Sequence, residues 1–196
     1  MKMNIGHLDL GKVFFTADSH FGHENIIKFC NRPFVNASEM DREMERRWCE
    51  IVPDDGIVFH LGDFTLGGDM VADGYFQMLT GEIKMLSNPW HHDKRWLLNP
   101  DMHYATGYGA PVVLLPPMVV LEVPQMEQNG YPLAITLCHY PIGEWDRKHY
   151  GAWHLHGHSH GNYKYVSTEK AIDVGVDCWD FRPVSFSRIA ERMTDY

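Results

Sequence analysis

The sequence lacks any long hydrophobic run. Although 44% of its 196 residues are hydrophobic, no stretch approaches the about 18 consecutive apolar residues that a membrane-spanning helix needs. Residues 1–7 also lack the apolar centre of a signal peptide. We therefore expect a cytoplasmic protein with no membrane partner.

Cysteine is scarce too. The chain has four, at Cys30, Cys49, Cys138 and Cys178. No two of them form a C-x-x-C pair, which argues against a thiolate zinc site. In a reducing cytoplasm we expect them to be small buried apolar residues rather than disulfide partners.

Positively charged residues are also few. The chain has 17 Lys and Arg residues against 26 Asp and Glu residues, which gives a formal net charge of -9. Non-specific binding to long nucleic acid needs a basic face, so we do not expect it here, although bound divalent ions would offset several carboxylates. Internal repeats and linkers are missing as well. We therefore expect a single domain over residues 1–196.

Histidine, in contrast, is abundant, with thirteen residues. Excess histidine together with excess acid is the side-chain set that transition metals prefer. The densest stretch is L-H-G-H-S-H-G at residues 155–161. In an extended segment alternate side chains point the same way, so His158 and His160 could face one metal ion. The alternative is a histidine-rich surface loop.

Short apolar runs alternate with helical patterns in the first half of the chain. We expect strands at 12–17, 57–61 and 83–86, and helices at 24–30, 37–51 and 69–79. This alternation predicts parallel strands. In the second half we expect strands at 112–115, 118–123, 133–137 and 172–177, an Asn129-Gly130 hairpin turn, and a last helix from Ser185 to about Met193.

Metal-type side chains follow the expected strands. They are Asp18, His20, Asp63, Asn88, His139, His158 and His160. In open α/β sheets, ligands bind at the carboxyl ends of strands. The set is too large for one zinc ion, whereas two ions that share a carboxylate would use all of it.

The order of these motifs resembles that of the calcineurin-like metallophosphoesterase superfamily: D-x-H, G-D, an Asn-containing strand end, H, and G-H-x-H. The resemblance runs from Asp18 to His160. Longer strings are similar to those of a small bacterial and phage branch: D-S-H-F-G-H-E-N-I-I at 18–27, N-R-P-F at 31–34, H-L-G-D-F at 60–64 and G-V-D-C-W-D-F-R-P-V at 175–184.

The resemblance implies an α/β fold, a metallophosphoesterase-type β-sandwich of two mixed sheets flanked by α-helices. It also implies two divalent transition-metal ions, with manganese favoured and iron, zinc or nickel as alternatives. The implied ligands are Asp18, His20 and His160 for the first ion and Asn88, His139 and His158 for the second, with Asp63 bridging both.

One loop departs from the family pattern, which reads G-N-H-D or G-N-H-E. Here Ser87 replaces the glycine, and Pro89-Trp90 separates Asn88 from a histidine pair. The resemblance gives that histidine the role of protonating the leaving group. We therefore expect His92 to be the catalytic acid with Asp93 orienting it, and His91 is the alternative.

The expected reaction is hydrolysis of a phosphomonoester or phosphodiester. Two metal ions lower the pKa of a bridging water, and the resulting hydroxide attacks phosphorus. His23 and Asn25 are expected to contact the substrate phosphate, or alternatively to form local turn hydrogen bonds. We expect a small or end-exposed phosphate ester as the partner. The chain does not indicate an oligomeric state.

Three other functions compete with this one. A metallo-β-lactamase-type hydrolase needs H-x-H-x-D-H, and residues 156–160 lack its Asp-His pair. A catalytically weak metal-binding scaffold of the same fold stays open because of the altered loop after Asn88. A nuclease or nucleotide phosphodiesterase stays open because the metal ligands do not select the ester.

Overall fold

Four parallel strands form the sheet of the first half of the chain. The computed structural model describes residues 1–88, 92–97, 103–164 and 170–194. The sheet pairs, in spatial order, β2 (Val13–Thr16), β3 (Ile57–His60), β4 (Glu82–Leu86) and β5 (Val112–Leu115). A short antiparallel strand, β10 (Val184–Ser185), completes it beside β2. The predicted parallel pairing of the first three strands is confirmed.

The second half of the chain supplies most of a second five-stranded sheet. Its spatial order is β1 (Lys2–Asn4), β6 (Met118–Gln128), β7 (Tyr131–Cys138), β8 (Trp153–His156) and β9 (Ala171–Asp173). Only β6 and β7 are antiparallel neighbours. Their hairpin turns at Asn129 and Gly130, which have φ values of 51° and 82°, as expected for this turn pair. Both sheets are therefore mixed.

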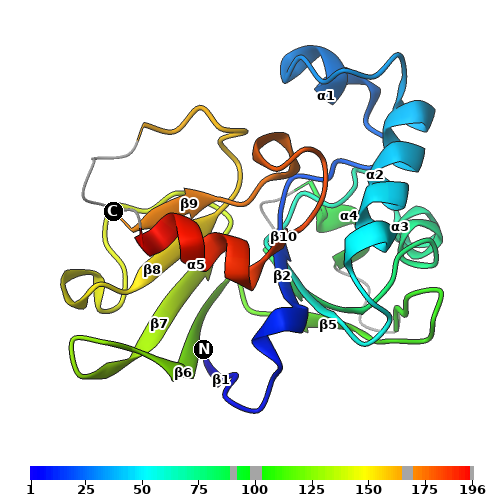
Figure 1. Cartoon of the computed structure of the whole chain (residues 1–196). Helices are drawn as coiled ribbons and strands as arrows, with labels where there is room; N and C mark the ends of the chain where they lie inside the picture. The colour runs from blue at the N-terminus through cyan, green and yellow to red at the C-terminus, as the bar shows by residue number, and fades with distance from the viewer. Residues whose placement is uncertain (89–91, 98–102, 165–169, 195–196) are drawn as a thin grey trace.

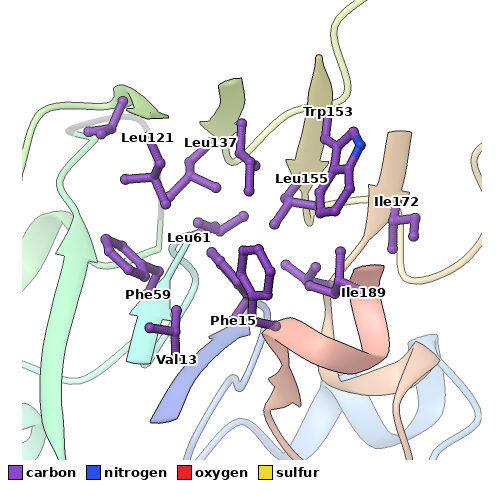
Figure 2. Packing of buried hydrophobic residues seen from close by; sticks show 14 of the residues in the cluster. Val13, Phe15, Phe59, Leu61, Leu121, Leu137, Trp153, Leu155, Ile172 and Ile189 are labelled. Carbon is purple, nitrogen blue, oxygen red and sulfur yellow. The ribbon is translucent and has the colours of Figure 1, made fainter. Parts of the chain in front are cut away.

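The main hydrophobic core lies between the two sheets (Figure 2). Side chains of successive strand residues point to opposite faces. Val13 and Phe15 accordingly enter this core, while Phe14 between them belongs to a second cluster on the other face of β2. The sheets meet through the buried side chains Phe15, Phe59 and Leu61 on one side and Leu121, Leu137, Trp153 and Leu155 on the other.

Helices cover the outer face of the first sheet. They are α1 (Glu24–Phe29), α2 (Ala37–Ile51), α3 (Asp69–Phe76) and α4 (Lys94–Leu97). Helix α2 begins after the cap residue Asn36, whose side chain accepts a hydrogen bond from the Glu39 N–H at 2.9 Å. Its apolar stripe of Met40, Met44 and Trp48 is buried against β3 and β4 residues. The stripe fixes which face of α2 turns inward.

The last helix, α5 (Phe186–Thr194), crosses between β9 and β10 (Figure 1). Ile189 and Met193 bury its apolar side in the core between the sheets. Ser185 accepts a hydrogen bond from the Arg188 N–H at 3.3 Å, as expected of a helix cap. Three short 3₁₀ segments, Leu10–Lys12, Lys148–Tyr150 and Val176–Cys178, complete the described elements.

Several elements differ from the expectations. Strand β6 extends beyond residue 123, and α3 ends at Phe76 rather than at residue 79. The expected strand at 172–177 stops at Asp173, because the Asp173 carboxylate accepts the Gly175 N–H at 2.8 Å and turns the chain. The short elements β1, β10 and α4 have too few residues to show a periodic pattern.

The expectation that the four cysteines are buried was wrong for three of them. Only Cys138 is buried; Cys30 is half-buried, and Cys49 and Cys178 are exposed, all as free thiols. The charged residues of α2 are also not all solvated. Asp41 is buried, and its carboxylate accepts hydrogen bonds from the Gly22 N–H and the Tyr75 hydroxyl.

No helix in the described part of the chain has the length and apolar character that a membrane crossing requires. The fold instead brings the carboxyl ends of β2, β3 and β4 to one edge of the first sheet. The predicted ligands follow these strands, and the remaining ones follow β7 and β8 of the second sheet.

Candidate metal centre

The loops after β2 and β3 run side by side. The backbone N–H of Asp18 donates to the Gly62 carbonyl at 3.0 Å, and that of His20 donates to the Asp63 carbonyl at 3.0 Å. These hydrogen bonds continue the parallel pairing past the ends of the strands. The loops therefore hold their acidic and histidine side chains next to one another.

Six of the seven predicted ligands gather into two groups of three, in each of which the candidate ligand atoms lie within 4.8 Å of one another: Asp18, His20 and His160, and Asp63, His139 and His158. The side chains come from loops after β2, β3, β7 and β8, so both sheets contribute. The first group has the three residues that the resemblance assigns to the first ion, whereas the second has Asp63 with His139 and His158 and does not include Asn88.

Asp63 belongs to the second group and also approaches the first. One of its carboxylate oxygens, Oδ2, is 3.6 Å from His20 Nε2 and 3.6 Å from His139 Nε2. Its other oxygen, Oδ1, accepts the His92 backbone N–H at 3.1 Å. The residue is 5% exposed. A single buried carboxylate thus faces a histidine from each group, as a bridging ligand must.

The backbone of the site is strained. Asp18, His20, Asp63, His158 and His160 all have positive φ values, between 45° and 66°. Residues with a Cβ rarely adopt this left-handed region, and each instance costs about 1–3 kcal/mol. The expectation that His158 and His160 share one target through an extended segment was therefore wrong. The backbone turns at both residues, and their side chains join different groups.

The electrostatics of the first group suit a cation. Burial, with the nearby Asp63 charge, raises the pKa of Asp18 well above its usual value. Burial, with the Arg32 charge, lowers the pKa of His20 well below its usual value, so its imidazole is neutral. Asp18 Oδ1 and both ring nitrogens of His20 are buried and have no hydrogen-bond partner among the described residues. Buried polar atoms without partners fit a metal ion, which the Asp18 oxygen and the unprotonated ring nitrogen of the neutral His20 could bind.

A carboxylate outside the predicted set orients His160. The Asp177 Oδ2 atom lies 2.7 Å from His160 Nδ1. Burial alone would raise the pKa of Asp177, but its hydrogen bonds to His160 and Arg32 lower it, so the carboxylate is ionised. Arg32 pairs with Asp177 through two 2.8 Å hydrogen bonds and also donates to the Asp18 and Ser19 carbonyls.

Sequence reasoning gave no role to either residue of this pair. Asp177 and Arg32 lie within strings that carry the family resemblance, 175–184 and 31–34, and this was the only available signal. Their separation of 145 residues hides the contact. Only the fold reveals that together they support the first ligand group.

Close backbone packing surrounds Asp18. A Cβ atom added to Gly157 would lie 2.5 Å from Asp18 Oδ2, and one added to Gly175 would lie 2.7 Å from the same atom. The Asp18 carboxylate also accepts the His158 backbone N–H at 2.9 Å. Nearby, Asp173 Oδ2 accepts the Gly161 N–H at 2.9 Å, which anchors the other end of the histidine loop.

The loop after β4 holds the remaining predictions. Asn88 is buried two residues beyond β4, and its role as a ligand stays a prediction. His91 lies outside the described residues. His92 is exposed, its ring centroid lies 5.3 Å from that of His20, and its Nε2 atom lies 4.0 Å from Asp63 Oδ2. It is therefore placed beside both ligand groups and open to solvent.

The expectation that Asp93 orients His92 was wrong. Its Oδ1 atom instead accepts the N–H groups of Phe64 and Thr65, at 2.9 and 3.0 Å, and the indole N–H of Trp96 at 3.1 Å. Burial raises the pKa of this carboxyl to about 7, against the lowering effect of these hydrogen bonds. Asp93 thus anchors the loop to the chain after Asp63 rather than serving the imidazole.

The two predicted substrate contacts differ in placement. The ring centroid of His23 lies 5.5 Å from that of His20 and 6.1 Å from that of His92. His23 therefore borders the ligand groups. Asn25 is exposed in the first turn of α1, and its contact with a substrate stays a prediction.

Comparison with protein-family models finds no match. The uncharacterized protein MJ1445 of Methanocaldococcus jannaschii is 30% identical over 191 residues, covering 94% of this chain and 92% of the archaeal one. The gene 66 protein of Mycobacterium phage L5 is 25% identical over 187 residues, covering 87% of this chain and 88% of the phage protein.

A solved structure shares the fold. The protein of unknown function AQ665 from Aquifex aeolicus aligns with a TM-score of 0.63 and 19% sequence identity, covering 92% of this chain and 98% of the other. At this identity the similarity shows the fold alone. The full-length match means that the two mixed sheets and their flanking helices form a shared architecture.

Proposed function

The chain belongs to the family of the uncharacterized archaeal protein MJ1445, and we propose that it is a dinuclear metal-dependent phosphoesterase. The observation that carries the proposal is the position of Asp63, whose Oδ2 atom lies 3.6 Å from a histidine of each ligand group. A structural zinc site needs four ligands around one ion and no shared carboxylate.

The proposal includes the finer fold assignment. Two mixed sheets with their core between them, and ligand loops at the carboxyl ends of the strands, correspond to the β-sandwich of the calcineurin-like metallophosphoesterases. The superfamily resemblance of the sequence supports the same assignment. Neither observation depends on the other, since one is the order of motifs and the other is their arrangement in space.

The proposed ligands divide as in the resemblance. Asp18, His20 and His160 would hold one ion and Asn88, His139 and His158 the other, with Asp63 between them. Two divalent ions held there, manganese first and iron, zinc or nickel as alternatives, would supply an activated water and neutralise phosphoryl oxygens. Histidine nitrogens with carboxylate oxygens are a donor set that all these metals accept.

The residues of the chain contribute the rest of the reaction. His92, exposed and 4.0 Å from Asp63, is placed to donate a proton from its imidazole to the departing ester oxygen. His23 borders the same opening and would contact the phosphate. Asp177 holds His160 in one tautomer, and Arg32 fixes Asp177 in turn.

The substrate we propose is a small or end-exposed phosphate ester. His92 and His158 are exposed, so the ligand groups open directly to solvent. The net charge of -9 disfavours a long polyanion. Activity as a nuclease or nucleotide phosphodiesterase falls within this chemistry, because the ligands do not distinguish one ester from another.

Hydrolysis of nitrophenyl phosphate and bis-nitrophenyl phosphate with added manganese tests the proposal. The wild-type protein should turn over at least one of them, and Asp63→Asn should lose several orders of magnitude in kcat because both ions would be misplaced. Asp180→Asn, in an exposed ion pair, is the matched control. Manganese binding without hydrolysis would favour the metal-binding scaffold. Undiminished turnover by Asp63→Asn would refute the ligand scheme.

A further inference from the structure

A cavity away from the candidate metal centre is lined in part by residues of α5, the last helix of the chain, which Figure 1 shows in red. Its volume is about 440 Å³, within the range of small-molecule pockets. Residues 178–185 and α5 form most of its lining, which includes Trp179, Asp180, Arg182, Arg188 and Arg192. None of these residues belongs to the proposed catalytic centre.

The charge of this cavity is opposite to that of the chain. Three arginines and one aspartate line it, although acidic residues outnumber Lys and Arg by 26 to 17 overall. The aspartate is already paired: Asp180 Oδ1 lies 2.6 Å from Arg47 Nη1, and its Oδ2 lies 2.6 Å from Arg182 Nη2. The lining therefore carries positive charge that its own acid does not neutralise.

Two of the arginines retain hydrogen-bond donors. Arg182 Nε is buried and has no partner among the described residues. Arg192 stacks over the indole ring of Trp179, with its guanidinium carbon 5.6 Å from the ring centroid. Within the described part of the chain it has no carboxylate partner. Arg188, in contrast, pairs with Glu191 at 3.0 Å. Guanidinium groups with unused donors match phosphate oxygens, which they bind in pairs.

A smaller cavity of about 170 Å³ adjoins the first and shares Cys178, Trp179 and Arg192 with it. Its lining also includes Gly161, which follows the candidate ligand His160. Cys178 likewise follows Asp177, which holds the His160 imidazole. The smaller cavity, which Asp173 also lines, thus borders the residues that directly follow His160 and Asp177 in the chain.

We propose that the arginine-lined cavity binds a phosphorylated small molecule, with its phosphate held by Arg182 and Arg192 and the rest of the molecule against Trp179. The volume exceeds what a bare phosphate fills, which favours a phosphate carried on a larger group. A long nucleic acid is disfavoured, because the remainder of the acidic chain repels a polyanion. This binding does not require the proposed catalysis.

Calorimetric titration of the metal-free protein tests the proposal, because chelation removes competing phosphate binding by metal ions. The probes are inorganic phosphate, pyrophosphate and AMP. Pyrophosphate or AMP should bind the wild-type protein, and Arg192→Gln and Arg182→Gln should each weaken binding by about tenfold or more. Arg46→Gln, an exposed arginine paired with Glu43 and Glu50, is the matched control and should bind normally. Asp63→Asn should bind normally as well.

Several outcomes would overturn the proposal. They are no binding to the wild-type protein, binding by Arg192→Gln and Arg182→Gln that is as tight as that of the wild type, or binding that Asp63→Asn alone abolishes. Tighter binding of single-stranded oligonucleotides than of AMP would replace the small molecule with a nucleic acid. Equal affinity for phosphate and AMP would likewise overturn the role of Trp179. Circular dichroism melting of each variant distinguishes lost binding from lost folding.

Discussion

The Nδ1 atom of His160 lies 2.7 Å from the Oδ2 atom of Asp177. Because hydrogen bonds from His160 and Arg32 keep Asp177 ionised despite its burial, the carboxylate accepts and the imidazole Nδ1–H donates. The opposite nitrogen, Nε2, then carries a lone pair and is the one available beside Asp18 and His20. Metal-binding histidines are commonly fixed in this way.

Replacing Asp177 with Asn should therefore weaken metal binding. The amide holds the imidazole less firmly and lacks the negative charge, so we expect a loss of about 10–100-fold in affinity for one of two manganese ions. Manganese titration followed by electron paramagnetic resonance would measure it. Asp180→Asn, in the same loop but paired with Arg47, is the control. Equal losses in both variants would contradict a specific role for Asp177.

Elemental analysis should find about two manganese ions per chain after loading and desalting. Two ligand groups, with Asp63 between them, are the reason. Binding should also raise the melting temperature, because it relieves the cost of burying the Asp18 carboxylate. Chelation should reverse this rise. A ratio of one ion per chain, with every proposed ligand intact, is incompatible with a dinuclear centre.

His92→Ala should retain both metal ions and lose activity on alkyl phosphate esters by about 10²–10⁴-fold. Nitrophenyl esters should lose less, since their leaving group needs little protonation. Steady-state kcat values on the two ester types measure the difference. His91→Ala should have the smaller effect on both. The reverse ranking would assign the proton donor to His91, and small equal losses would mean that no imidazole assists the leaving group.

Asp93 should make the stability of the metal-free protein depend on pH. In the folded protein the pKa of its carboxyl is about 7, well above the usual value of 3.8. Its contribution to stability is therefore complete below about pH 4 and is lost as pH rises through about 7. Asp93→Asn, which mimics the protonated acid, should lack this decline. Urea unfolding at several pH values measures it.

Asp93→Ala gives a second view of the same residue. It leaves three N–H donors without their acceptor, and should lower the free energy of unfolding by about 3 kcal/mol or more. The same pH slope in wild type and Asp93→Asn would show that another group titrates. A small loss in Asp93→Ala would mean that water replaces the carboxylate.

The ends of the parallel strands could be predicted from the sequence, and with them much of the candidate site. An apolar run followed by an acid, as at Asp63, has a local signature, and parallel pairing brings such ends together. The residues that hold the ligands and their loops in place could not be predicted in this way. Asp177 contacts His160 and Arg32 only because the fold brings them together. The Asp93 carboxylate accepts a backbone hydrogen bond from Phe64, not one from its sequence neighbour His92. Spacing along the chain carries no record of these contacts.

The positive φ angles of the site could not be predicted from the sequence either. Alternation suggested an extended histidine stretch, but His158 adopts a φ of 66°. His158→Gly should therefore raise the free energy of unfolding of the metal-free protein by about 1 kcal/mol, because glycine enters this region without strain. Urea unfolding checks this. His149→Gly, an exposed histidine without a positive φ, should instead lower stability slightly. No gain in His158→Gly would mean that the turn is not strained.

The five left-handed residues at the metal centre also bear on how this chain would change under selection. Laboratory evolution for heat resistance, carried out without metal and without any demand for activity, should accumulate glycine or asparagine at Asp18, His20, Asp63, His158 and His160 before most of the hydrophobic core changes. Conversely, the persistence of aspartate and histidine at such positions in a natural lineage would mark continued use of the site. Because these backbone angles are strained, retained aspartate and histidine in these loops would indicate selection for function.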